Sequence, residues 1–166
     1  MAGKHAPIEV GKYFEIHAAA MRALERAGRV LRGCDGLTVE PVARGLLMSG
    51  RIQCAGGITI DVAKRLAILD GEGESAIVQT AAYTYHVMVD GLGNLLRYCG
   101  PHDDEAHPGH KPFHHKHSYD VLRDDVEGTV ATVDAETRPT LAEVITEACA
   151  WYYEHAAEIE VRRGAK

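Results

Sequence analysis

The sequence lacks the cysteine pattern and the signal peptide that are typical of secreted proteins and of proteins stabilised by a structural metal. Its four cysteines, Cys34, Cys54, Cys99 and Cys149, form no Cys-x-x-Cys pair, so neither a zinc ribbon nor a disulfide framework is indicated. No signal-peptide h-region follows the N-terminus, and no later apolar run reaches the length that a bilayer requires. These absences predict free thiols in a soluble, cytoplasmic protein without a membrane partner.

Internal repeats are also absent, and nothing in the composition separates a second unit of comparable size. With 166 residues, 46% of them hydrophobic, the chain can bury one ordinary core. We therefore expect a single domain over residues 1–166. The sequence does not indicate the oligomeric state.

The net charge of −6 does not by itself exclude a nucleic-acid partner, because the acidic excess is confined to one part of the chain. Residues 1–117 carry 13 Lys and Arg against 13 Asp and Glu, whereas residues 118–166 carry 5 against 11. Near the N-terminus, four arginines recur at helical spacing, at positions 22, 26, 29 and 32. This pattern is typical of a solvated helix face, and an RNA-facing or partner-facing stripe is the alternative.

Apolar residues recur every three or four positions from Lys12 to Leu31, which predicts an amphipathic helix that the glycines at 33 and 36 end. Strand patterns and turn signals then predict three strands and, after another turn, a fourth: Leu46–Cys54, Ile58–Leu69, Ala76–Val89 and Leu95–Tyr98. Because the turns between these strands are short, we expect a four-stranded antiparallel meander.

A second helix is predicted near the C-terminus. Thr140 follows Pro139 and is followed three positions later by Glu143, which is the capping box of a helix start. Apolar spacing continues this helix to about Ile159, and residues 160–166 are expected to fray. The order of helix, strands and helix indicates an α+β fold with the helices on one face of the sheet.

Six of the ten histidines fall in one short stretch, and they are His102, His107, His110, His114, His115 and His117. Histidine titrates near neutral pH, so this stretch can supply acids, bases or metal ligands. If residues 112–117 are extended, His115 and His117 point one way, and His114 and Lys116 point the other way. Two imidazoles can then converge on one small site.

RNA cleavage without a metal requires a base, an acid and a cation that binds the phosphate. The clustered histidines can supply the base and the acid. Lys116, or Arg97 on the predicted fourth strand, can supply the cation. On the predicted third strand, Tyr85 and His86 occupy opposite faces.

Three other interpretations stay open. Imidazoles at this spacing also suit zinc, copper, nickel or iron, although the cluster lacks the thiolate or the His-Glu-x-x-His spacing of well-defined zinc sites. The histidine stretch is otherwise a solvated polar segment, with Arg97 as an edge-strand charge that prevents aggregation. A non-catalytic module that binds a partner through its sheet edge or basic helix is the last alternative.

Several short motifs follow one another in a fixed order: Tyr83-x-Tyr85-His86, Leu96-Arg97-Tyr98, Pro101-His102, Pro112-Phe113-His114-His115-Lys116-His117 and Pro139-Thr140-Leu141-x-Glu143-Val144. As an ordered set, they resemble the TumE-type toxins of bacterial type II toxin–antitoxin systems. The resemblance covers about residues 45–150. In one departure, Cys99-Gly100 follows Arg97-Tyr98, where the family carries Asp-Asn.

The resemblance implies a small toxin that acts on RNA or on translation and is held inactive by a cognate antitoxin, commonly a helix-turn-helix protein. We therefore predict a metal-independent ribonuclease with RNA as its substrate and without a cofactor or metal ligand. The catalytic candidates are His102, His114, His115, His117 and Arg97, and the substrate-binding candidates are Lys116, Tyr85 and His86. A metal-binding protein and a non-catalytic interaction module are the alternatives.

Overall fold

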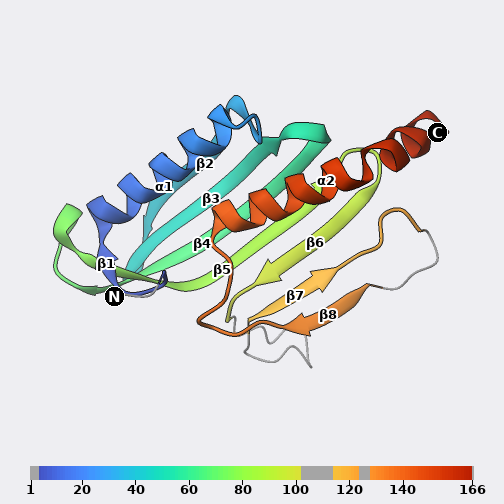
Figure 1. Cartoon of the computed structure of the whole chain (residues 1–166). Helices are drawn as coiled ribbons and strands as arrows, with labels where there is room; N and C mark the ends of the chain where they lie inside the picture. Colours follow the sequence, from blue (N-terminus) through green and yellow to red (C-terminus); the bar gives the residue numbers. More distant parts are fainter. Residues whose placement is uncertain (1–3, 102–113, 124–127, 166) are drawn as a thin grey trace.

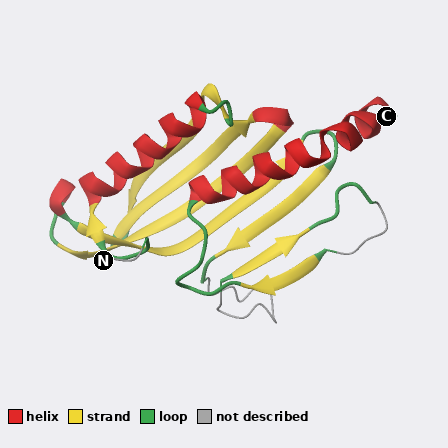
Figure 2. Ribbon diagram, viewed as in Figure 1, coloured by secondary structure: helices red, strands yellow, loops and turns green. Residues whose placement is uncertain are grey.

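The computed structural model describes residues 4–101, 114–123 and 128–165. In these residues, one antiparallel sheet lies against two long helices (Figures 1 and 2). The elements in chain order are β1 (Ile8–Glu9), α1 (Val10–Arg26), β2 (Val30–Val42), β3 (Gly45–Cys54), the 3₁₀ turn η1 (Ala55–Gly57), β4 (Ile58–Asp70), the 3₁₀ turn η2 (Gly73–Ser75), β5 (Ile77–Val89), β6 (Gly93–Cys99), β7 (His115–Ser118), β8 (Thr129–Thr132) and α2 (Leu141–Gly164).

Consecutive strands are neighbours in the sheet, in the order β2-β3-β4-β5-β6-β7-β8, and the short β1 pairs with β5 outside this path. The predicted α+β class and antiparallel meander are therefore confirmed. The predicted count of four strands is wrong, because the described residues form eight. The four predicted strands correspond to β3, β4, β5 and β6, and their predicted ends lie within two residues of the observed ends.

The missed strands carry no clear alternation of apolar and polar residues. In β2, an edge strand interrupted by glycines and a proline, Val30 is buried and most other residues are exposed. β7 is a polar His-Lys-His-Ser segment, and every residue of β8 is exposed. Backbone pairing with a neighbouring strand, rather than burial of an apolar face, therefore defines these elements.

The first helix ends five residues before its predicted end at Leu31, since α1 stops at Arg26. The amide of Ala27 donates to the carbonyl of Ala23, and Gly28 then adopts a left-handed conformation with φ of 68°. The chain is thereby turned back, and Val30 pairs with Cys54 in β3. The apolar residue at 31 continues the helical spacing by coincidence, because it belongs to a strand.

The capping box at the start of α2 is confirmed. The Thr140 hydroxyl accepts from the Glu143 amide at 3.3 Å, and the Glu143 carboxylate accepts from the Thr140 amide at 2.6 Å. The predicted fraying from residue 160 is not observed, because α2 continues to Gly164. Arg163 there donates to the carbonyl of Gly56 at 2.9 Å, and this bond holds the last turn against η1.

Both helices cover the same face of the sheet, as Figure 1 shows. One apolar cluster joins the inner sides of the helices to that face, and its fully buried members include Met48, Ile52, Ile60, Tyr85, Val87, Val144, Ile145 and Ala148. No helix in the described part of the chain has the length and apolar character needed to cross a bilayer.

We expect the Thr140→Ala substitution to lower the free energy of unfolding by about 1 kcal/mol, because the Glu143 amide loses its side-chain acceptor. Urea unfolding followed by circular dichroism measures this change. Thr132→Ala, at an exposed position of β8, is the matched control and should change the free energy of unfolding by less than half as much. Equal losses in the two variants would contradict a stabilising role of the cap.

Candidate functional site

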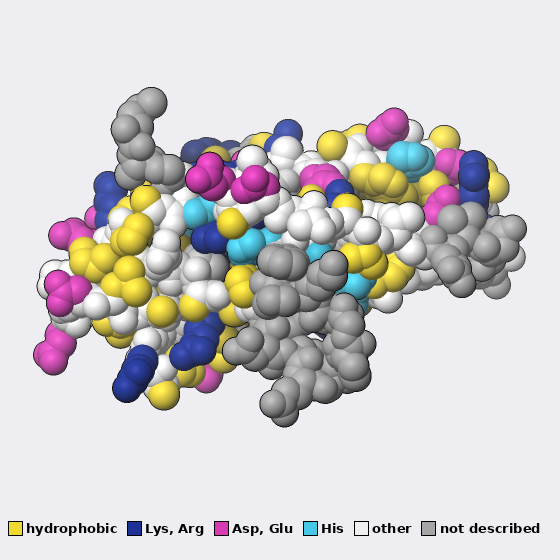
Figure 3. Space-filling model, turned by 90° about the horizontal axis from the view of Figure 1, so that it is seen from below, with side chains coloured by type: hydrophobic (Ala, Val, Ile, Leu, Met, Phe, Trp, Pro, Cys, Tyr) yellow, Lys and Arg dark blue, Asp and Glu magenta, His cyan; other side chains and the backbone are white. Residues whose placement is uncertain are grey.

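The pairing of β7 with β6 decides where the clustered histidines lie. His115 stands opposite Cys99, and His117 stands opposite Arg97. Because side chains alternate along a strand, these four residues project to the face of the sheet that the helices leave uncovered. The predicted convergence of His115 and His117 is thus observed. Figure 3 shows that histidine side chains reach the surface of the molecule at several places on the side seen from below.

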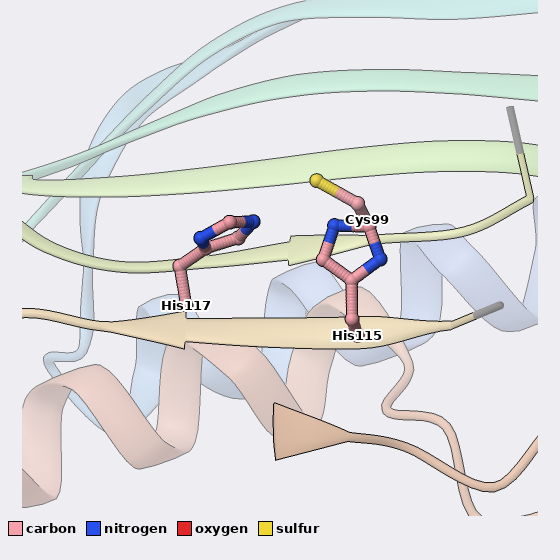
Figure 4. A group of neighbouring side chains, drawn as sticks. All are labelled: Cys99, His115 and His117. Atoms are coloured by element: carbon pink, nitrogen blue, oxygen red, sulfur yellow. The ribbon is translucent and has the colours of Figure 1, made fainter. Parts of the chain in front are cut away.

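Cys99, His115 and His117 form a compact cluster. One sulfur or ring nitrogen from each lies within 4.8 Å of the corresponding atoms of the other two. The two imidazole rings are 4.9 Å apart between centroids and meet edge to face. Figure 4 shows that all three side chains project to the same side of the two strands. Cys99 is 1% exposed and His115 is 8% exposed, so little of the cluster reaches solvent.

Arg97 lies between two histidines on this face. It stands opposite His117 on one side and opposite His86 of β5 on the other side. Its Nε atom is buried, and no hydrogen-bond acceptor for it lies among the described residues. A buried guanidinium N–H without an acceptor costs free energy, and an anionic ligand such as a phosphate would satisfy it.

The same row of side chains continues across the sheet from His86 to β4 and β3. His86 Nε2 is 2.9 Å from the Asn94 side-chain oxygen. Its neighbour on β4, Asp61, accepts two hydrogen bonds from Arg51, at 2.6 and 2.9 Å, and this arginine holds the pKa of Asp61 below its usual value. The carboxylate of Asp61 is therefore already neutralised by Arg51, and it does not pair with Arg97.

Two predicted substrate-binding residues lie on the opposite, helix-covered face. Lys116 forms an ion pair with Glu147 of α2, and its ammonium lies 5.2 Å from the centre of the Tyr98 ring. Tyr98 also donates to Glu147 at 2.8 Å. Tyr85 is 1% exposed and belongs to the apolar core. The structure thus separates Lys116 and Tyr85 from the Arg97 face and gives them packing contacts.

His114 also faces the helices. Its Nε2 accepts from Arg138 Nη1 at 3.4 Å, so Nδ1 carries the proton and donates to the Tyr83 hydroxyl at 3.2 Å. Burial, followed by the nearby charge of Arg138, lowers the pKa of His114 below its ordinary value. His114 is therefore separated from His115 and His117, and His102, another predicted catalytic residue, lies outside the described residues.

Cys99 is the member of the cluster that the sequence reasoning missed. The histidine stretch contains no cysteine, and the nearest one belongs to a different strand. The sequence signal that could have identified Cys99 is its position two residues after Arg97, which places both side chains on one face of β6. The β6–β7 register was needed to show that His115 is its partner.

Comparisons with known proteins add no relative. No protein-family model, no curated protein and no solved structure matches this chain. The resemblance to the TumE-type toxins therefore stays a prediction from the sequence motifs.

Protonation of His114 should destabilise the fold. Its pKa is lowered in the folded protein, so the folded state resists the proton that the unfolded state takes up as the pH falls below about 6.5. We expect the free energy of unfolding to fall between about pH 7.5 and pH 5.5, and to fall less in a His114→Gln variant. Urea unfolding at several pH values, in buffer containing a chelator, measures how the free energy of unfolding changes with pH in the wild type and in the variant.

Tyr83→Phe is the control for this experiment, because it removes the hydroxyl contact but keeps His114 buried beside the ring. Its pH slope should match that of the wild type. If the free energy of unfolding changed equally with pH in the wild type and in His114→Gln, the burial of His114 would not contribute to the pH dependence of stability.

Proposed function

We propose that this chain is a ribonuclease, the toxin of a type II toxin–antitoxin pair, that cleaves RNA in the cytoplasm without a metal. The observation that carries the proposal is the position of Arg97, whose buried Nε has no acceptor among the described residues and whose strand partner is His117. A phosphodiester supplies the missing negative charge, and two imidazoles stand beside it. The antitoxin partner is inferred from the motif resemblance alone.

The arrangement suits cleavage through the 2′-hydroxyl of RNA. One imidazole of the His115–His117 pair takes the 2′-hydroxyl proton, and the 2′-oxygen attacks phosphorus. The other imidazole donates a proton to the departing 5′-oxygen, which leaves a 2′,3′-cyclic phosphate and a 5′-hydroxyl. Arg97 stabilises the negative charge that builds on the phosphate oxygens. His86, on the other side of Arg97, contacts the substrate rather than the reacting atoms.

The test is inducible expression in bacteria, followed by growth measurement and total-RNA analysis. The wild type should arrest growth and fragment RNA, whereas His117→Gln and Arg97→Met should lower cleavage by about 100-fold or more, because each removes one required group. The matched controls are His155→Gln on α2 and Arg65→Met on β4, and both should retain cleavage. Full cleavage by His117→Gln or Arg97→Met would contradict the proposal.

Metal independence is tested on the purified protein. Cleavage of a defined RNA by the wild type should be unchanged by an excess of chelator, and the products should end in a 2′,3′-cyclic phosphate. Loss of cleavage on chelation would instead support the second candidate function.

A metal-binding protein is the second candidate, and the observation that favours it is Cys99. The cluster contains the cysteine sulfur that the histidine stretch itself lacks, so one sulfur and two nitrogens converge within 4.8 Å. Sulfur and imidazole ligands suit Zn²⁺ and similar borderline-soft ions. These side chains would hold the metal at three positions and leave a fourth for water, which the metal would acidify.

Cobalt substitution distinguishes this candidate. If the cluster binds metal, Co²⁺ added to reduced, tag-free protein should give the near-ultraviolet absorption of a thiolate–cobalt bond with one ion per chain. Cys99→Ser should abolish that absorption, whereas Cys34→Ser, at another free cysteine, should keep it. An unchanged spectrum in Cys99→Ser, or no absorption in the wild type, would exclude this cluster as a metal site.

A further inference from the structure

A cavity of about 500 Å³ lies on the other face of the sheet, between α1, the start of α2 and the middle of the sheet. Its walls are largely apolar and include Ile16 and Ala20 of α1, Met48 of β3 and Leu141 of α2. This volume is typical of a small-molecule site. None of the residues proposed above for RNA cleavage lines it.

Lys64 reaches into this cavity from β4, an interior strand of the sheet. It alternates with the buried Val62 and Leu66, so its side chain must share the helix-covered face with them. Only 9% of the residue is exposed. Its ammonium lies 5.0 Å from the centre of the Tyr13 ring, and within the described part of the chain it makes no ion pair.

A buried ammonium without an anionic partner is costly. Burial, followed by the nearby positive charge of Arg138, lowers the pKa of Lys64 to about 8. The amine is therefore still mostly protonated at neutral pH. It retains three N–H donors for an acceptor that the described residues do not supply.

The described part of the cavity lining supplies no carboxylate for Lys64. Lys4, His5 and His17 line the same cavity, and no Asp or Glu is among the described residues that do so. Lys4 is paired with Glu143, and burial lowers the pKa of both histidines, so Lys64 is the cation of this lining that the described residues leave without an anionic partner. Arg138, 9% exposed, has a buried Nε without an acceptor among the described residues, and its carbonyl is 2.7 Å from His5 Nε2. Two carboxylates outside the cavity lining act on residues of this region: Asp35 acts on His17, and Glu143 pairs with Lys4.

From the buried Lys64 ammonium, the apolar walls and the acid-free lining, we propose that this cavity binds a carboxylate with an apolar body, such as a medium-chain fatty acid. The carboxylate pairs with Lys64, and the hydrocarbon chain packs between α1 and α2. Lys64 thus complements the charged end of the ligand, and the apolar walls complement its hydrocarbon chain. This site is independent of the proposed nuclease function, so the failure of either leaves the other standing.

Isothermal titration of the full-length protein with decanoate and with decanol tests the proposal. The two probes share their chain length and differ in the charged end. The wild type should bind decanoate at one site, at least tenfold more tightly than decanol. Equal affinities, or no saturable binding of decanoate, would overturn the proposal.

The variant Lys64→Met removes the charge and keeps the length of the side chain. It should bind decanoate at least tenfold more weakly than the wild type, while decanol binding is kept or improved. Lys12→Met, on the solvent side of α1 where Lys12 pairs with Glu15, is the matched control and should bind decanoate as the wild type does. Unchanged decanoate binding by Lys64→Met would overturn the role of the ammonium.

A third probe, decyl phosphate, distinguishes the headgroup. The carboxylate assignment predicts that decyl phosphate binds no more tightly than decanoate, because one ammonium faces the ligand. Tenfold tighter binding of decyl phosphate would overturn the carboxylate and assign the site to a phosphate headgroup. If Lys64→Met fails to fold, the comparison of decanoate with decanol on the wild type decides the outcome alone.

Discussion

The register between β6 and β7 is the constraint on which the candidate site depends. It places Cys99 against His115 and Arg97 against His117, on the face of the sheet away from the helices. A slip by one residue would transfer every side chain of β7 to the other face. The imidazoles would then meet α2, and Lys116 would take their place beside Arg97.

That register is supported from the helix-covered face. Lys116 and Tyr98 are register partners, and both bind Glu147 of α2. A shifted β7 would leave the half-buried Glu147 without its lysine, at the cost of an unpaired charge. The polar residues of β7 therefore have two roles. Lys116 attaches the strand to α2, and His115 and His117 form the cluster on the face away from the helices.

Both faces of the sheet carry cations that have no acidic partner among the described residues. Arg97 on one face and Arg138 on the other each bury an Nε for which the described residues provide no acceptor, and Lys64, 9% exposed, forms no ion pair with the described residues. Other charged side chains form ion pairs, such as Arg51 with Asp61 and Lys4 with Glu143. The two places proposed to bind an anion therefore share a cation without an acidic partner among the described residues, and they differ in their surroundings. The Arg97 place is flanked by imidazoles, whereas the Lys64 place opens into an apolar cavity.

The sequence by itself determined the features that depend on local pattern. The capping box fixed the start of α2, and apolar alternation with glycine turns located β3 to β6, because these signals arise from neighbouring residues. Alternation also predicted that His115 and His117 share one side and Lys116 the other. Only the tertiary structure decided what lies opposite them. Cys99 lies beside the histidines, Lys116 pairs with Glu147, and Lys64 is buried under the helices. These contacts join residues that are distant in sequence, and no local pattern encodes the strand register that brings them together.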